Sequence, residues 1–268
     1  MSSADVLTVK GFGFNPKNPF ISEEYYFYHF QEIHGPVALE MDQIRRYIQL
    51  HGTSQRLAPF SQSIYLAHAE CWFESVDSHQ SCKDDPNRLL SGRDGLTLHD
   101  KTPGRQVELS TIESVKFGHD VEPGTEGLTK GVLLVRKHHT AGTAEFQSWW
   151  HNTLPALVRS TIPGLVRHVQ SVADTDRYLD CNPVFDGVLE LWWDDPALLD
   201  TGVDLTDFAA HLKGSPISFQ DTVSHVGKEI RIRWPGHPEQ RRSPERDRIS
   251  GLDIVRMPNW LLEQFGPR

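Results

Sequence analysis

The chain has 268 residues, of which 38% are hydrophobic and 24% are charged, and its formal net charge is −9. This acidic balance, without a dominant basic run, disfavours nucleic acid as a partner. No apolar run approaches the roughly 20 residues that cross a bilayer, and the N-terminus lacks a signal-peptide core, so no membrane partner is expected. The three cysteines form no Cys-x-x-Cys pair, which disfavours a disulfide framework or a zinc site and predicts a cytoplasmic location.

The first half of the chain is predicted to contain four strands and one well-marked helix. Its β-rich composition predicts strands over 6–14, 44–51, 64–73 and 107–119. The helix is expected over 22–34, between the Asn-Pro breakers of 15–19 and the dipeptide Gly35-Pro36. The polar segment 74–106 is expected to be loop with a short helix.

The helix over 22–34 carries the strongest functional signal. Ser22 is a good N-cap, and two glutamates follow in the first turn, where the helix dipole favours negative charge. Tyr26, Phe30 and His34 recur at i, i+4 and i+8, so they share one helical face. A titratable ring therefore lies in line with the residues that must be buried.

The second half repeats the first at an offset close to 120 residues. That offset separates Glu70 from Glu190 (190 − 70 = 120) and Trp72 from Trp192 (192 − 72 = 120). A helix is expected over 143–155, and strands over 131–136, 164–170, 185–194 and 223–234. One offset shared by several motifs indicates a duplication.

Each half has the element order β-α-β-β-(α)-β, which is typical of the ferredoxin-like fold. A four-stranded sheet with helices on one side leaves its other face bare, and a second copy can cover that face. The predicted fold is therefore α+β, with tandem ferredoxin-like repeats forming an intramolecular dimeric α+β barrel. The predicted domains are repeat 1 (1–127), repeat 2 (128–235), and a linker with a C-terminal tail (236–268).

Three motifs in this order resemble the EthD-like family of the dimeric α+β barrel superfamily. They are the aromatic helix that ends in His34-Gly35-Pro36, the strand segment 46–49, and Glu70-Cys-Trp-Phe73. The second half resembles the last motif more closely, in residues 185–193, but has Thr153 or Leu154 where the family histidine falls. The resemblance therefore implies one working pocket in the first half and a mainly structural second half.

His34 is the leading candidate for a general acid or base, because its helix C-terminus favours imidazolium while burial favours the neutral ring. The alternative is a structural histidine that holds the turn before Gly35. His68 and Glu70 share one face of their strand and could stand opposite His34 if that face lines the barrel; the alternative is that this face packs under the helix. Tyr47 could orient a substrate oxygen, or its hydroxyl could only satisfy a carbonyl.

The predicted catalytic set is thus His34, His68, Tyr47 and Glu70. The predicted substrate-binding set is Tyr26, Phe30, Trp72, His29 and His151. No nucleotide-binding, hydrolase or metalloprotease motif occurs, so neither a cofactor nor a metal is expected.

The resemblance implies a small apolar substrate, aromatic or polyketide-like, as the partner, and association into a homo-oligomer is left open. The expected function is a cofactor-independent lyase, dehydratase or cyclase that uses His-centred acid–base chemistry. The alternatives are a cofactor-free monooxygenase of an aromatic substrate and a non-catalytic small-molecule-binding accessory protein.

Overall fold

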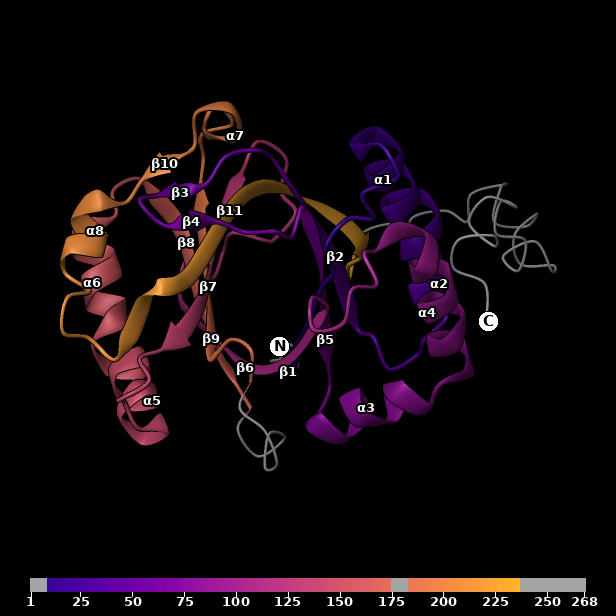
Figure 1. The fold of residues 1–268 in the computed structure, drawn as a ribbon, viewed down its shortest axis with the longest axis horizontal. Helices are drawn as coiled ribbons and strands as arrows, with labels where there is room; N and C mark the ends of the chain where they lie inside the picture. Colours follow the sequence, from indigo (N-terminus) through magenta and orange to yellow (C-terminus); the bar gives the residue numbers. More distant parts are fainter. Residues whose placement is uncertain (1–8, 175–182, 237–268) are drawn as a thin grey trace.

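A closed barrel of eight antiparallel strands forms the centre of the computed structural model, which describes residues 9–174 and 183–236 (Figure 1). The strand order is β2-β5-β1-β6-β8-β9-β7-β11, and β11 pairs with β2 to close the ring. The first four strands in chain order are β1 (Val9–Phe14), β2 (Arg46–Gly52), β5 (Ala67–Phe73) and β6 (Val107–Phe117). The other four are β7 (Thr129–Lys137), β8 (Leu165–Ala173), β9 (Gly187–Trp193) and β11 (Ile217–Arg233). The predicted α+β fold with an intramolecular barrel is confirmed.

The two halves of the barrel have the same strand order. The first half reads β2-β5-β1-β6 and the second reads β8-β9-β7-β11, so in each half the third strand lies between the first and the second. The halves meet at two seams, β6 with β8 and β2 with β11. The origin of this arrangement by duplication and the domain boundary at 127 and 128 stay predictions. The expected tail lies outside the described residues from position 237 onward.

A short arm of the first half crosses to the second. It contains β3 (Leu57–Ala58) and β4 (Ser61–Gln62), which pair with β10 (Val203–Asp204) and β11 respectively. Leu57 and Phe60 are fully buried in the hydrophobic core of the second half. This segment therefore ties the two halves together.

Helices cover the outer face of each half, on opposite sides of the barrel (Figure 1). The first half carries α1 (Glu23–His29), the π-helix η1 (Phe30–His34), α2 (Gly35–Ala38), α3 (Val76–Ser81), the 3₁₀-helix η2 (Cys82–Asp84) and α4 (Pro86–Leu98). The second carries α5 (Thr143–Asn152), α6 (Leu154–Thr161), α7 (Leu198–Thr201) and α8 (Thr206–Ala210). None of the helices in the described ranges is long and apolar enough to cross a membrane.

The aromatic helix does not end at His34, as the sequence had suggested, but continues as α2 to Ala38. Pro36 has no N–H to give to the carbonyl four residues earlier, so a regular α-helix cannot pass through it. The chain widens instead into a π-helical turn, in which the Gly35 N–H bonds to the Phe30 carbonyl. The turn thus carries His34 at the junction of two helical segments.

The segment 74–106 was predicted as loop with a short helix, but it contains α4, a helix of 13 residues. Its interior holds Gly92 and Gly95 and shows almost no apolar periodicity, which is why the sequence pattern fails to reveal it. Its start follows ordinary rules, because Asp85 accepts from the Asn87 N–H and Pro86 occupies the first turn.

Candidate active site

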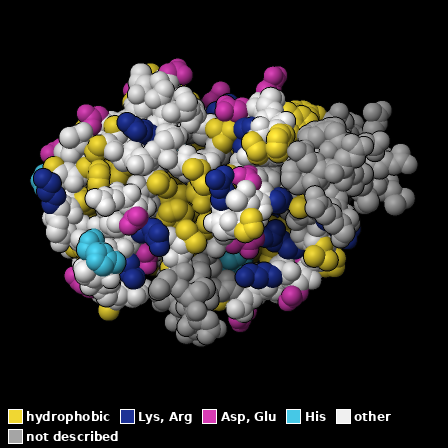
Figure 2. All heavy atoms as spheres, in the orientation of Figure 1, with side chains coloured by type: hydrophobic (Ala, Val, Ile, Leu, Met, Phe, Trp, Pro, Cys, Tyr) yellow, Lys and Arg dark blue, Asp and Glu magenta, His cyan; other side chains and the backbone are white. Residues whose placement is uncertain are grey.

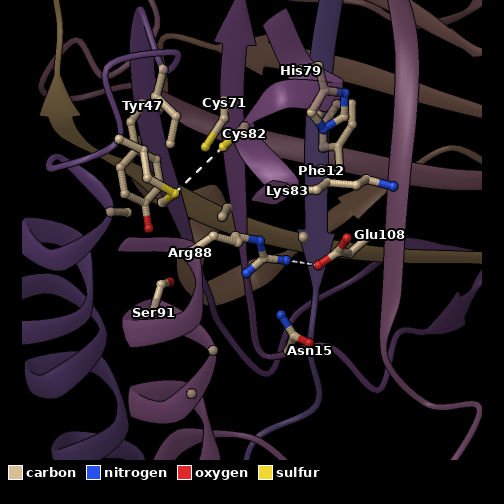
Figure 3. A pocket seen from close by; sticks show the side chains of 18 of the residues that line it. Phe12, Asn15, Tyr47, Cys71, His79, Cys82, Lys83, Arg88, Ser91 and Glu108 are labelled. Atoms are coloured by element: carbon tan, nitrogen blue, oxygen red, sulfur yellow. Dashed lines mark hydrogen bonds and ion pairs between the residues drawn. The ribbon is translucent and has the colours of Figure 1, made fainter. Parts of the chain in front are cut away.

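A cavity of about 480 Å³ lies between the outer face of the first-half sheet and its helices. Small residues form part of its floor, namely Gly11 and Gly13 on β1 and Ala69 and Cys71 on β5. The other lining residues that matter here are Ala38, Met41, Ile44, Tyr47, His34, Ser91 and His99, together with Lys83, Arg88, Lys101 and Glu108. Figure 3 shows how side chains from the strands and from α4 converge on this space.

The corresponding space in the second half is filled by leucines. Strand register pairs Gly13 with Ala69 in the first half and Leu133 with Leu189 in the second, at the 120-residue offset (13 + 120, 69 + 120). Both leucines are about 1% exposed within a large hydrophobic core. The size of the side chains on the sheet therefore explains why the cavity lies in the first half.

His34 is held by a buried carboxylate that no sequence motif revealed. Its Nδ1 lies 2.8 Å from Oδ2 of Asp94 on α4. The other oxygen, Oδ1, lies 2.7 Å from Nε2 of His29, whose Nδ1 lies 3.1 Å from the Tyr25 hydroxyl. A carboxylate only accepts hydrogen bonds, so both imidazoles donate to Asp94. The four groups form a continuous hydrogen-bonded chain.

The charge of Asp94 is stabilised by its two histidines. Burial alone would raise the pKa of Asp94, but the hydrogen bonds and charges of His29 and His34 outweigh burial and hold that pKa below its usual range. Since Nδ1 of His34 carries the donated hydrogen, the neutral ring presents an acceptor lone pair at Nε2. His34 lines the cavity, and no partner for Nε2 occurs among the described residues. This geometry is that of a general base backed by a carboxylate.

Aromatic stacking positions the His34 ring. Phe30 stacks on Tyr26 at 5.7 Å and on His34 at 5.6 Å, so the three residues predicted to share one helical face do form a column. Gln49 on β2 donates to the Phe30 carbonyl at 2.6 Å and so anchors the π-helical turn on the sheet. The His34 ring cannot turn without disturbing this column or the bond to Asp94.

Tyr47 lies in the same cavity as His34. Its hydroxyl oxygen accepts a hydrogen bond from Gln49 Nε2 at 2.9 Å. Burial, with smaller contributions that include the nearby Cys71 and Asp94, raises the pKa of Tyr47 far above its ordinary value. The phenol therefore stays protonated and can donate its hydrogen to a ligand oxygen.

His68 and Glu70 were predicted to stand opposite His34 if their strand face lined the barrel. That face does line the barrel, but His34 lies on the other side of the sheet. On β5, the residues that line the cavity are Ala69, Cys71 and Phe73, so the alternating His68, Glu70 and Trp72 point into the barrel. His68 Nε2 lies 2.8 Å from Glu70, and His68 Nδ1 lies 3.0 Å from His225 Nε2. These predicted site residues therefore belong to a separate, fully buried cluster.

The barrel interior is crossed by a network of lysines and glutamates. Lys10 Nζ lies 2.7 Å from both Glu70 and Glu190, and Lys130 Nζ contacts the same two carboxylates. The outer ends of the network are alike, because Glu113 accepts from Trp72 at 3.1 Å and Glu229 accepts from Trp192 at 2.9 Å. Sequence reasoning missed both lysines, although the same offset relates them (10 + 120 = 130) and could have revealed them.

The predicted substrate-binding residues do not line the cavity. Tyr26 and Phe30 belong to the packed core beneath α1, and Trp72 lies inside the barrel. His29 contacts Asp94 but does not line the cavity, and His151 is exposed on α5 of the second half. Within 9–174 and 183–236, no group of three or more His, Cys, Asp or Glu side chains is placed to hold a metal ion.

Comparisons with known proteins give the fold. No protein-family model matches the sequence, and no curated protein matches it. Among solved structures, an anthrone oxidase-like protein matches with a TM-score of 0.54 and 10% identity, over 84% of this chain and 92% of its own. A monooxygenase-like protein from Fusobacterium nucleatum matches with a TM-score of 0.50 and 9% identity, over 87% and 96%. The closed barrel and these neighbours show that the chain has the dimeric α+β barrel fold.

An EthD family protein from Bacillus halodurans also matches, with a TM-score of 0.31 and 14% identity. The match covers 38% of this chain and 95% of that one. A structural similarity with this TM-score does not indicate a shared family or a shared activity.

Proposed function

We propose that this protein is a cofactor-independent enzyme that performs acid–base chemistry on a small, largely apolar, aromatic or polyketide-like substrate in the first-half cavity. The observation that carries the proposal is the His34–Asp94 pair, in which a buried carboxylate fixes an imidazole at the wall of an open cavity. The EthD-like motifs around His34 support the same assignment.

In the proposed reaction, His34 Nε2 removes a proton from a carbon next to a substrate carbonyl. Asp94 stabilises the imidazolium that forms, and Tyr47 donates a hydrogen bond to the departing hydroxyl oxygen. The imidazolium then gives its proton to that oxygen, so His34 and Tyr47 both return to their starting states. A C–H bond and a C–O bond break, a C=C bond forms, and water leaves, which makes the step a dehydration. General acid–base catalysis of this kind contributes about 10²- to 10⁴-fold in rate.

A simple β-hydroxy ketone tests the proposal. 3-Hydroxy-1-tetralone loses water to give fluorescent 1-naphthol, so turnover can be followed directly. His34→Ala should lower the rate by at least about 10²-fold while the protein keeps its thermal unfolding transition. His139→Ala changes a histidine of the second half and is the control. Turnover by the wild type that persists unchanged in His34→Ala would overturn the role of His34.

A cofactor-free monooxygenase is the second candidate. It is favoured by the neighbours described as anthrone oxidase-like and monooxygenase-like, which share the fold. The same His34 base would deprotonate an electron-rich substrate such as anthrone, whose carbanion reacts with oxygen. Oxygen consumption with anthrone that depends on His34 would select this candidate. Binding without any turnover would select the accessory role.

A further inference from the structure

The lining of the cavity has an excess of positive charge. Among the described residues that line it, the charged ones besides histidines are the cations Lys83, Arg88 and Lys101 and one carboxylate, Glu108. The chain as a whole carries a net charge of −9, and the face shown in Figure 2 mixes acidic with basic side chains. The described lining of the cavity is therefore net positive in a chain that is net negative.

Arg88 and Glu108 form an ion pair across the cavity. Arg88 extends from α4 towards Glu108 on β6 (Figure 3). The two side chains are 35% and 60% exposed. Exposed ion pairs contribute only about 0–1 kcal/mol to stability, so a ligand anion can displace Glu108 from Arg88 at small cost.

Lys101 lies close to Arg88 and has no carboxylate partner in the described part of the chain. Burial and the charge of Arg88 both lower the pKa of Lys101. Its Nζ also approaches Gly95 of α4, near the His99 ring. Lys83, the third cation, likewise forms no ion pair with any described carboxylate. Like charges gathered around open space are unfavourable unless an anion joins them.

The other side of the cavity is apolar. Met41, Ile44 and Ala38 are almost fully buried there, beside Tyr47. A volume of about 480 Å³ falls within the range of sites that enclose small organic ligands. We infer that the cavity binds an amphipathic anion, whose ring system packs on Met41 and Ile44 and whose carboxylate or similar group replaces Glu108 at Arg88. This inference rests on the proposed function only in placing the substrate in this cavity.

A pair of dyes that differ in charge tests the inference on the full chain. 1-Anilinonaphthalene-8-sulfonate is an aromatic anion, and N-phenyl-1-naphthylamine has the same ring skeleton without the sulfonate. Arg88→Gln should weaken binding of the anionic dye by about tenfold, which corresponds to about 1.4 kcal/mol, and change that of the neutral dye by less than about twofold. Glu108→Gln should instead tighten binding of the anion, because Arg88 loses its competitor.

Two variants locate the effect. Lys213→Gln removes an exposed cation that does not line the cavity and should leave both affinities unchanged. The double variant Gly13→Leu with Ala69→Leu fills the cavity floor and should abolish binding of both dyes. Equal effects of Arg88→Gln on the two dyes, weaker anion binding by Glu108→Gln, or full binding by the filled variant would each overturn the inference.

The dye result is independent of the catalytic result. His34→Gln leaves Arg88 in place, so the ratio of its affinities for the two dyes should stay that of the wild type. Loss of turnover with retained charge preference would support both proposals. Charge preference without turnover would leave the anion site standing and remove the acid–base role.

Discussion

At the scale of single residues, Asp94 holds the His34 ring on which the proposed reaction depends. Asp94 is 4% exposed and accepts from two imidazoles, so Asp94→Asn should leave at least one buried donor without an acceptor. We expect a loss of about 10²- to 10⁴-fold in turnover and of about 1–3 kcal/mol in the free energy of unfolding. Kinetics and urea denaturation measure the two effects, with the exposed Asp207→Asn as the control.

Asp94 should also make the free energy of unfolding fall in acid. The pKa of folded Asp94 lies below its ordinary value of 3.8, so its carboxylate contributes stability above that value. This contribution is lost as the pH falls below 3.8 towards the folded pKa. The difference in unfolding free energy between wild type and Asp94→Asn should therefore shrink in acid. A difference that stays constant from about pH 6 to about pH 2 would contradict this assignment.

At the scale of elements, the small residues on the outer face of the first-half sheet leave the space that forms the cavity. A Cβ on Gly13 would lie 3.7 Å from the Ala69 Cβ, which is an ordinary contact, so a side chain can begin at this position without displacing the backbone. Gly13→Leu with Ala69→Leu should abolish turnover of 3-hydroxy-1-tetralone and keep or raise the thermal unfolding temperature, because apolar side chains fill a void. Calorimetry and the 1-naphthol assay measure the two quantities.

The matched change in the second half has the opposite outcome for stability. Leu133→Gly with Leu189→Ala removes two buried side chains from a packed core. Each buried leucine that is truncated to alanine costs about 2–5 kcal/mol. If this variant is as stable as the wild type, the two leucines do not fill the space in the second half that is open in the first.

The strand order could be predicted from the sequence. The element order β-α-β-β-(α)-β is typical of the ferredoxin-like fold, and the offset between Glu70 and Glu190 indicates that the second half repeats it. The column of Tyr26, Phe30 and His34 follows from helical spacing alone. The site could be predicted only in part. Asp94 lies on a helix without apolar periodicity, and no local pattern shows which face of β5 is turned towards the barrel. That choice depends on the partner sheet, which a strand's own sequence does not specify.

At the scale of the whole molecule, the lysine–glutamate network joins the two sheets. The charges of Glu190, Glu70 and Glu113 outweigh burial and raise the pKa of Lys10 above 10.5, so its contribution to stability is present below pH 10.5 and is lost as the pH rises further. Lys10→Met removes a fully buried cation from among carboxylates and should cost about 3–5 kcal/mol. Urea denaturation measures this cost against the exposed Lys213→Met.

A second substitution tests whether the cost comes from uncompensated charge. Adding Glu190→Gln to Lys10→Met removes one of the carboxylates left without its cation. The double variant should be destabilised by less than the sum of the two single variants, because the residues share one network. Strict additivity would mean that Lys10 stabilises the barrel through packing alone.

The seams of the barrel have one more consequence. If the two halves were separate chains, β6–β8 and β2–β11 would be subunit interfaces, and the barrel would come apart on dilution by mass action. Within one chain the halves meet at a fixed effective concentration, so the barrel stays closed however dilute the protein is. The two halves are different stretches of one chain, so their sequences can differ. A leucine can therefore occupy one floor while a glycine keeps the other open, which identical subunits could not achieve.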